Sequence, residues 1–172
     1  FVSTVDGLFI LIGKVPATAS EAAWAQVGDI LGSFTHDSLG ETEDAAYVDP
    51  AGQAPAPPTL PTAPQMVPAL SYTINTPEGW TSEPSESASG RLLRLSGGAG
   101  TGLCVELGRV PMGALTQEQL GQMAVALSVG NPLLATLIAE SELRVHEGIG
   151  RAIAYSGRSG DTPHRALMHL IA

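Results

Sequence analysis

Apolar residues gather at both ends of the chain, in a pattern typical of two neighbouring strands. Residues 8–12 (Leu-Phe-Ile-Leu-Ile) are an unbroken apolar run, and residues 167–172 (Leu-Met-His-Leu-Ile-Ala) are nearly as apolar. Read as if the ends were joined, they form a hairpin with its turn at Asp6-Gly7, a pair that favours the positive φ of tight turns. Since domains seldom start or stop inside an apolar strand, residues 167–172 should be continuous with, or pair beside, residues 8–12, within one chain or between two.

The first apolar run predicts a central strand, and a helix follows it. Residues 8–12 lack the alternation of a half-exposed strand, so we expect them to be buried on both faces until Pro16 ends the strand. Thr18 or Ser20 can cap the helix, and Gly32 marks its end. Apolar side chains at helical spacing predict one buried face, made of Trp24, Val27, Ile30 or Leu31, and Phe34.

Residues 38–69 differ in composition and predict a linker. The segment begins with acidic residues and continues with closely spaced prolines among alanines and threonines. Dense proline favours extended backbone without internal hydrogen bonds. The chain is therefore expected to divide into residues 1–37, a strand and an amphipathic helix that complete the sheet; residues 38–69, the linker; and residues 70–172, the main α+β body.

The body is predicted to begin with three strands, at residues 70–74, 91–95 and 103–110. Residues 77–80 (Pro-Glu-Gly-Trp) indicate a turn after the first of them. The glycine-rich residues 96–102 invite a phosphate-loop interpretation. However, they lack the G-x-G-x-x-G spacing, no Gly-Lys-Ser/Thr motif follows them, and the next predicted element is a strand instead of a helix. This segment is expected to be a hairpin loop.

Two helices are predicted next, separated at Asn131-Pro132 because the residue before a proline avoids the α region. The first begins at a Thr116 cap, and the second covers residues 133–143. A strand at residues 145–155, a turn at 156–163 and a last strand from Arg165 follow. The inward helix side chains are expected to be Leu120, Met123, Ala124 and Leu127, then Leu134, Leu137 and Ile138.

The charge balance excludes some classes of partner. The chain of 172 residues has 8 Lys and Arg against 17 Asp and Glu, a net charge of −9. Its few basic residues are scattered, whereas nucleic acids and anionic membranes are bound by clustered Lys and Arg. No apolar run reaches the roughly 18 residues of a membrane span, so no direct membrane insertion is expected.

The candidate chemistry is sparse. Cys104, the only cysteine, lies in an apolar run and is expected to be a buried strand residue. His36, His146, His164 and His169 show no H-x-H or H-x-x-x-H spacing, so no metal site is predicted. No G-x-S-x-G elbow occurs, and no nucleophile stands beside a base. We expect no catalytic residues, no cofactor and no enzymatic activity.

Four further stretches are informative: residues 72–80 (Tyr-Thr-Ile-Asn-Thr-Pro-Glu-Gly-Trp), 147–157 (Glu-Gly-Ile-Gly-Arg-Ala-Ile-Ala-Tyr-Ser-Gly), 6–13 (Asp-Gly-Leu-Phe-Ile-Leu-Ile-Gly) and 30–34 (Ile-Leu-Gly-Ser-Phe). Together they resemble the PsbP/Mog1/DcrB-like superfamily, which includes DUF1795-type and LpqN-like bacterial proteins. The family's last strand and helix here precede the rest, as in a tandem-array fragment, a circular permutant or a swapped protomer. The resemblance implies an α+β fold with a central antiparallel sheet and helices packed on it, its segment order permuted.

The resemblance also implies non-enzymatic roles: stabilising a photosynthetic complex, binding small GTPases, or chaperoning transmembrane segments of type VI secretion effectors. We therefore expect a binding or structural/assembly module, such as a chaperone or accessory domain of a bacterial envelope or secretion complex. Its partner would be a protein, through self-association or a neighbouring repeat. The alternatives are an enzyme or a small apolar-ligand carrier whose site is assembled only in three dimensions. The single cysteine and the proline-rich linker are compatible with an exported bacterial protein.

The predicted interaction residues are those that complete the sheet. They lie in the first strand, on the apolar face of the first helix and in the last strand. They are Leu8, Phe9, Ile10, Leu11, Ile12, Trp24, Val27, Leu31, Phe34, Leu167 and Leu170.

Overall fold

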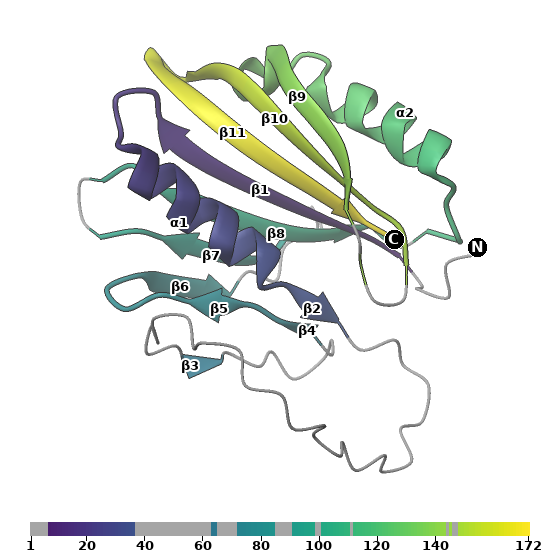
Figure 1. The fold of residues 1–172 in the computed structure, drawn as a ribbon, viewed down its shortest axis with the longest axis horizontal. Helices are drawn as coiled ribbons and strands as arrows, with labels where there is room; N and C mark the ends of the chain where they lie inside the picture. The colour runs from purple at the N-terminus through teal and green to yellow at the C-terminus, as the bar shows by residue number, and fades with distance from the viewer. Residues whose placement is uncertain are drawn as a thin grey trace, which may run out of the picture.

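The computed structural model is an α+β fold built on a seven-stranded antiparallel sheet in the order β6-β7-β8-β1-β11-β10-β9 (Figure 1). It describes residues 7–36, 63–64, 72–84, 91–98, 101–110, 112–143, 145 and 148–172. The strands of this sheet are β1 (Leu8–Pro16), β6 (Thr81–Pro84), β7 (Arg91–Ser96), β8 (Cys104–Val110), β9 (Thr136–Leu143), β10 (Gly150–Ser159) and β11 (Thr162–Ile171). The expected fold class is confirmed at the level of an antiparallel sheet with helices packed on it.

β1 lies in the middle of the sheet and joins the two ends of the described chain. On one side it pairs with β11, from Phe9 opposite Ile171 to Pro16 opposite His164. On the other side it pairs with β8. The predicted pairing of residues 167–172 with residues 8–12 is confirmed, and it occurs within one chain. Residues 1–5 and Asp6 of the predicted hairpin turn lie outside the described residues.

α1 (Glu21–Gly32) covers one face of the sheet, over β1, β8 and β11 (Figure 1). Of the two predicted caps it is Ser20 that accepts a hydrogen bond, from the backbone N–H of Ala23. The predicted apolar face of the helix is confirmed, with Trp24 only partly buried. The main buried side chains of this core are Val27, Ile30, Leu31 and Phe34 from the helix region and Phe9, Leu11, Val15, Leu93, Leu95, Val105, Leu107 and Ile171 from the sheet.

α2 (Gln117–Ser128) and the short 3-10 helix η1 (Pro132–Leu134) cover the opposite face, over β10 and β11. Thr116 caps α2 as predicted, in a capping box with Gln119. β1 supplies both cores because alternate strand residues point to opposite faces. The buried side chains of this second core are Leu8, Leu120, Ala124, Leu134, Ile153, Tyr155, Ala166, Met168 and Leu170.

Two short strand pairs lie outside the large sheet. β2 (Thr35–His36) pairs with β4 (Tyr72–Thr73), and β3 (Ala63–Pro64) pairs with β5 (Asn75–Thr76). β4 occupies only part of the strand predicted at residues 70–74. β3 is the described part of the predicted linker; the rest of that prediction lies outside the described residues.

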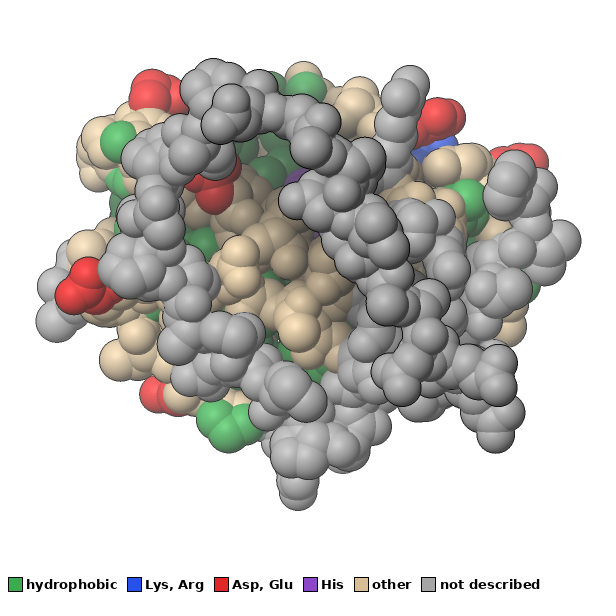
Figure 2. Space-filling model, turned by 60° about the horizontal axis from the view of Figure 1, so that its bottom comes forward, with side chains coloured by type: hydrophobic (Ala, Val, Ile, Leu, Met, Phe, Trp, Pro, Cys, Tyr) green, Lys and Arg blue, Asp and Glu red, His purple; other side chains and the backbone are tan. Residues whose placement is uncertain are grey.

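Charged side chains lie around the outside of the fold. Figure 2 shows Asp and Glu side chains dispersed over one face of the molecule, with little Lys or Arg among the described side chains in view. Arg165 of β11 pairs with Glu21 of α1 at 2.9 Å. Its guanidinium also lies 4.8 Å from the centre of the Trp24 ring. These contacts hold the first turns of α1 on the sheet.

The helix predicted at residues 133–143 is wrong. η1 ends at Leu134, and the strand β9 follows. Leu134 is buried as predicted, whereas Leu137 and Ile138 are exposed. The helical spacing of these leucines was outweighed by antiparallel pairing of residues 136–143 with β10, interrupted only at Ile138.

The turn predicted at residues 156–163 is shorter in the structure. β10 continues to Ser159 and β11 begins at Thr162, so only two residues connect them. Gly160 has a φ of 61°, a conformation that glycine adopts without steric cost. The predicted strand at residues 145–155 correspondingly starts later, at Gly150.

α1 approaches the sheet closely at Gly13 of β1. A Cβ built there would clash with Cγ1 of Val27 and would lie 3.0 Å from Cδ1 of Leu31. The backbone of η1 lies as closely against Gly157 of β10 on the other face. Both helical layers therefore pack directly on glycines of the sheet.

Gly13→Ala should destabilise the fold, because the added methyl group would push α1 away from β1. We expect a loss of about 1–3 kcal/mol in the free energy of unfolding, the usual cost of overpacking. The matched control is Gly28→Ala inside α1, where a Cβ would meet only Leu167, at 4.0 Å; it should stabilise by about 0.5–1 kcal/mol. Urea unfolding measures both, and an unchanged stability of Gly13→Ala would contradict the close packing.

Deletion of residues 1–37 should abolish cooperative unfolding of the remaining chain. β8 and β11 would lose the strand that lies between them, and both cores would lose side chains of β1. Thermal unfolding followed by circular dichroism measures this effect, and adding residues 1–37 as a separate peptide should restore the transition. A truncated chain with an unchanged transition would show that β1 is dispensable.

Candidate interaction surface

β9 forms one edge of the sheet (Figure 1). All of its eight residues except Leu143 are exposed. Its inner side pairs with β10, so the backbone N–H and C=O groups on its outer side can pair with another strand. β6, at the opposite edge, has four residues and ends at Pro84, which has no N–H to donate. Of the two edges, β9 is therefore the better template for strand pairing.

Large apolar side chains are exposed in β9 and at the end of α2. Leu137 and Ile138 are 55% and 57% exposed, and Val125 and Val129 are 63% and 76% exposed. These fractions are high enough for each side chain to lose substantial water contact in a complex. We call β9 together with these four side chains the β9 surface.

The last turn of α2 lies beside the start of β9. Tyr155 of β10 is opposite Leu137 in the strand register, and its hydroxyl makes a hydrogen bond with Ser128 of α2. Burial raises the pKa of Tyr155, the negative charge of Glu140 raises it further, and the hydrogen bond with Ser128 opposes the shift. The Tyr155 side chain thus connects the end of α2 to β10, beside the position where Leu137 of β9 pairs.

One side of α2 faces β10 and, through Arg151, is linked to Glu140 of β9. Gly121, Val125 and Ser128 share a row of the helix surface, since they are four and three residues apart. A Cβ at Gly121 would lie 3.1 Å from Nη1 of Arg151, and Arg151 forms an ion pair with Glu140 of β9. The exposed side chain of Val125 therefore lies in the same row of α2 as Gly121, the residue beside Arg151.

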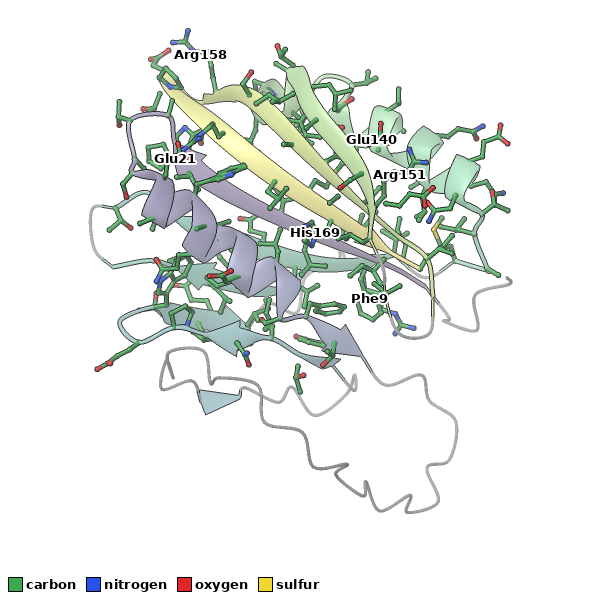
Figure 3. The ribbon with its side chains drawn as sticks, in the orientation of Figure 1. Phe9, Glu21, Glu140, Arg151, Arg158 and His169 are labelled. Atoms are coloured by element: carbon green, nitrogen blue, oxygen red, sulfur yellow. The ribbon has the colours of Figure 1, made fainter. Side chains whose placement is uncertain are left out.

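Arg151 connects α2, β10 and β9 (Figure 3). Besides pairing with Glu140, its Nη2 donates a hydrogen bond to the backbone carbonyl of Gln117 at 3.1 Å. The side-chain amide of Gln117 in turn donates to the carbonyl of Gly150 at 3.4 Å. These contacts position β9 against the helix and the rest of the sheet.

A β-bulge at Ile138 interrupts the β9–β10 register. Ala139 lies opposite Ala154 and Leu137 lies opposite Tyr155, which leaves Ile138 without a partner in the ladder. A bulge changes the direction of a side chain and increases the local twist of an edge strand. The bulge therefore sets the side-chain direction at Ile138 within an otherwise regular pairing of β9 with β10.

The predicted interaction residues complete the sheet within their own chain. The structure places all of them in or against the two cores, so they form no separate exposed surface. The buried ones are Leu8, Phe9, Leu11, Val27, Leu31, Phe34 and Leu170, and the partly buried ones are Ile10, Ile12, Trp24 and Leu167.

Sequence reasoning missed the β9 surface because the leucine spacing of residues 133–143 predicts a helix with Leu134, Leu137 and Ile138 facing inward. Residues 139–143 (Ala-Glu-Ser-Glu-Leu) alternate between small or apolar and charged side chains. That alternation is the period of a strand and was the available signal. It was obscured by the leucine spacing just before it.

A shallow groove of about 300 Å³ lies on the α2 side of the sheet, over β1 and β8. Ile10 and Ile12 line it together with Glu106, Gly108 and Val110. Its volume is at the lower end of the range for small-molecule sites. This groove is the feature relevant to the alternative of an apolar-ligand carrier.

The described residues form no cluster of three or more His, Cys, Asp and Glu side chains that could hold a metal ion.

Cys104 is buried as predicted, and burial raises the pKa of its thiol. His164 and His169 lie at positions of opposite parity in β11 and so face opposite sides of the sheet. Within the described part of the chain, no helix has the length and apolar composition needed to cross a membrane.

Comparison of the chain with protein-family models, with curated proteins and with solved structures finds no match. The resemblance to PsbP/Mog1/DcrB-like proteins therefore stays a prediction.

His169 is buried between the sheet and the end of α1 (Figure 3). Burial lowers the pKa of its imidazole to about 4, and a hydrogen bond to the backbone carbonyl of Leu31 opposes this shift. The folded chain therefore holds His169 neutral at a pH where an exposed histidine would be charged.

Acid should destabilise the fold through His169. An unfolded histidine has a pKa of about 6.5, so between pH 6.5 and 4 the unfolded chain binds a proton that the folded chain does not. Stability present at pH 7 should fall by up to about 3 kcal/mol over this range. His169→Gln, which can keep the hydrogen bond to Leu31, should reduce that fall, whereas the control His164→Gln should not. Urea unfolding at pH 7, 5.5 and 4 measures the difference, and identical pH dependence in both variants would contradict the assignment.

Proposed function

We propose that this chain is a non-enzymatic protein-binding module that adds an extended segment of a partner protein to the edge of its sheet at β9. The observation that carries the proposal is the eight-residue edge strand, exposed along nearly its whole length. Strand addition gives affinity through backbone hydrogen bonds and specificity through alternate side chains. β9 offers both, since its outer backbone groups adjoin the exposed side chains of Leu137 and Ile138.

The expected strength of such binding is modest. Covering each of the four apolar side chains of the β9 surface would contribute on the order of 1 kcal/mol, and each backbone hydrogen bond about 0.5–1.5 kcal/mol. Association itself costs roughly 4–15 kcal/mol. A short peptide should therefore bind with a dissociation constant on the order of 0.1–1 mM, and a longer partner more tightly.

This function agrees with the roles implied by the resemblance to PsbP/Mog1/DcrB-like proteins, which are roles in protein binding and assembly. An accessory or chaperone domain of a bacterial envelope or secretion complex would need a surface that receives another chain. The proposal differs from the sequence-based expectation in where that surface lies. β1 and α1 are occupied within the chain, and β9 takes the partner.

The groove over β1 and β8 favours a second candidate function, the carriage of a small apolar ligand. Its floor of Ile10 and Ile12 and its wall at Val110 would contact such a ligand. It is open and shallow, whereas carriers usually enclose most of the surface of their ligand. The strand-addition function is therefore the better supported of the two.

The test is a titration of the ¹⁵N-labelled chain with a ten-residue peptide of alternating valine and threonine. We expect the backbone amide signals of residues 136–143 to shift at peptide concentrations of about 1 mM. A peptide of the same sequence, N-methylated at alternate residues, cannot donate the ladder hydrogen bonds and should cause no shift. Leu137→Ser combined with Ile138→Ser should weaken binding several-fold, because both side chains are exposed in the free chain.

Val110→Ser is the matched control, since it removes an apolar side chain from the groove and leaves β9 unchanged. It should not affect the titration. Shifts confined to residues around Ile10, Ile12 and Val110 would support the apolar-ligand function instead. Absence of any shift at β9 with the unmethylated peptide would refute strand addition.

A further inference from the structure

We infer that the segment received by β9 is basic, with lysine or arginine at alternate positions between apolar residues. This inference rests on the proposed function and adds the chemistry of the partner. Its basis is the arrangement of charge along β9 and around it.

The carboxylates of β9 lie on one face of the strand. Glu140 and Glu142 are two residues apart and so point to the same side, the side covered by α2, where Glu140 meets Arg151 (Figure 3). Glu118, in the first turn of α2, adds a further acidic group close to Arg151's partner Gln117. The strand itself contains no lysine or arginine.

Arg151 neutralises only part of this charge. It forms an ion pair with Glu140 while lying opposite Glu142 in the strand register. Among the described residues, no ion pair is formed by Glu142. Arg144 and Glu147 follow β9 in the sequence and contribute opposite charges; both lie outside the described residues. An incoming cation beside Glu142 would therefore meet an exposed carboxylate.

The opposite face of β9 suits apolar residues of the partner. Ala139 and Ser141 point to that side, and both are exposed and small. Directly opposed side chains of antiparallel strands lie close together, so small residues here leave room for valine, isoleucine or leucine. One face of the partner strand would thus carry cations, and the other would carry branched apolar side chains.

The same charges disfavour a second copy of this chain as the occupant. An antiparallel copy of β9 centred on Glu140, on Ser141 or on Glu142 would place glutamate directly opposite glutamate, which is destabilising. The net charge of −9 adds a general repulsion between copies. A basic segment of another protein avoids both penalties.

The experiment compares three ten-residue peptides on the ¹⁵N-labelled full chain, with valine alternating with lysine, with threonine or with glutamate. We expect the lysine peptide to bind at residues 136–143 about tenfold more tightly than the glutamate peptide at 20 mM salt, with the threonine peptide between them. The difference should shrink several-fold at 300 mM salt because these charges are exposed. Glu142→Lys should reverse the order of the lysine and glutamate peptides.

Glu78→Lys makes the same change of charge in a distant exposed turn and should leave the order unchanged. Urea unfolding of both variants establishes that they fold. Equal binding of the three peptides at β9 would overturn the basic-partner inference while supporting strand addition; no binding of any peptide would refute strand addition itself. A dimer in sedimentation that Ile138→Ser abolishes would also overturn the inference, because β9 would then bind a second copy.

Discussion

The structure depends on the pairing of β1 with two strands that are distant from it in the sequence. β11 on one side and β8 on the other are both hydrogen-bonded to it. Because successive residues of a strand point to opposite faces, this one strand also supplies Phe9 to the core under α1 and Leu8 to the core under α2. The order of the sheet, the position of both helices and the burial of Leu8 and Ile171 follow from that placement.

The helical layers are fitted to the sheet at specific small residues. Val27 and Leu31 of α1 reach the backbone of β1 at Gly13, and η1 lies against Gly157 of β10. Such close approach excludes water from the layer between helix and sheet, which is where the hydrophobic effect acts most strongly. It also explains why His169, which lies in that layer, has a lowered pKa.

Completing the sheet in this way leaves the two edges in different states. β6 is short and ends in proline, whereas β9 is long, exposed and bordered by apolar side chains of α2. The glutamates and the bulge of β9 are features that limit unspecific edge-to-edge pairing. An edge that resists copies of itself and keeps its backbone accessible is suited to a chosen partner, and this is the physical basis of the proposed function.

The sequence by itself determined the elements whose signals are local or strongly periodic. It predicted β1 as a central strand, the apolar face of α1, the Thr116 cap of α2 and the pairing of the two terminal segments, because apolar runs and capping residues act over a few positions. Only the tertiary structure decided the fate of residues 133–143. Their leucine spacing fits a helix. In the folded chain, however, residues 136–143 form a strand whose backbone groups bond to β10. The location of the proposed interaction surface was decided in the same way, since exposure of a strand edge depends on which strands pair, and that is a property of the complete sheet.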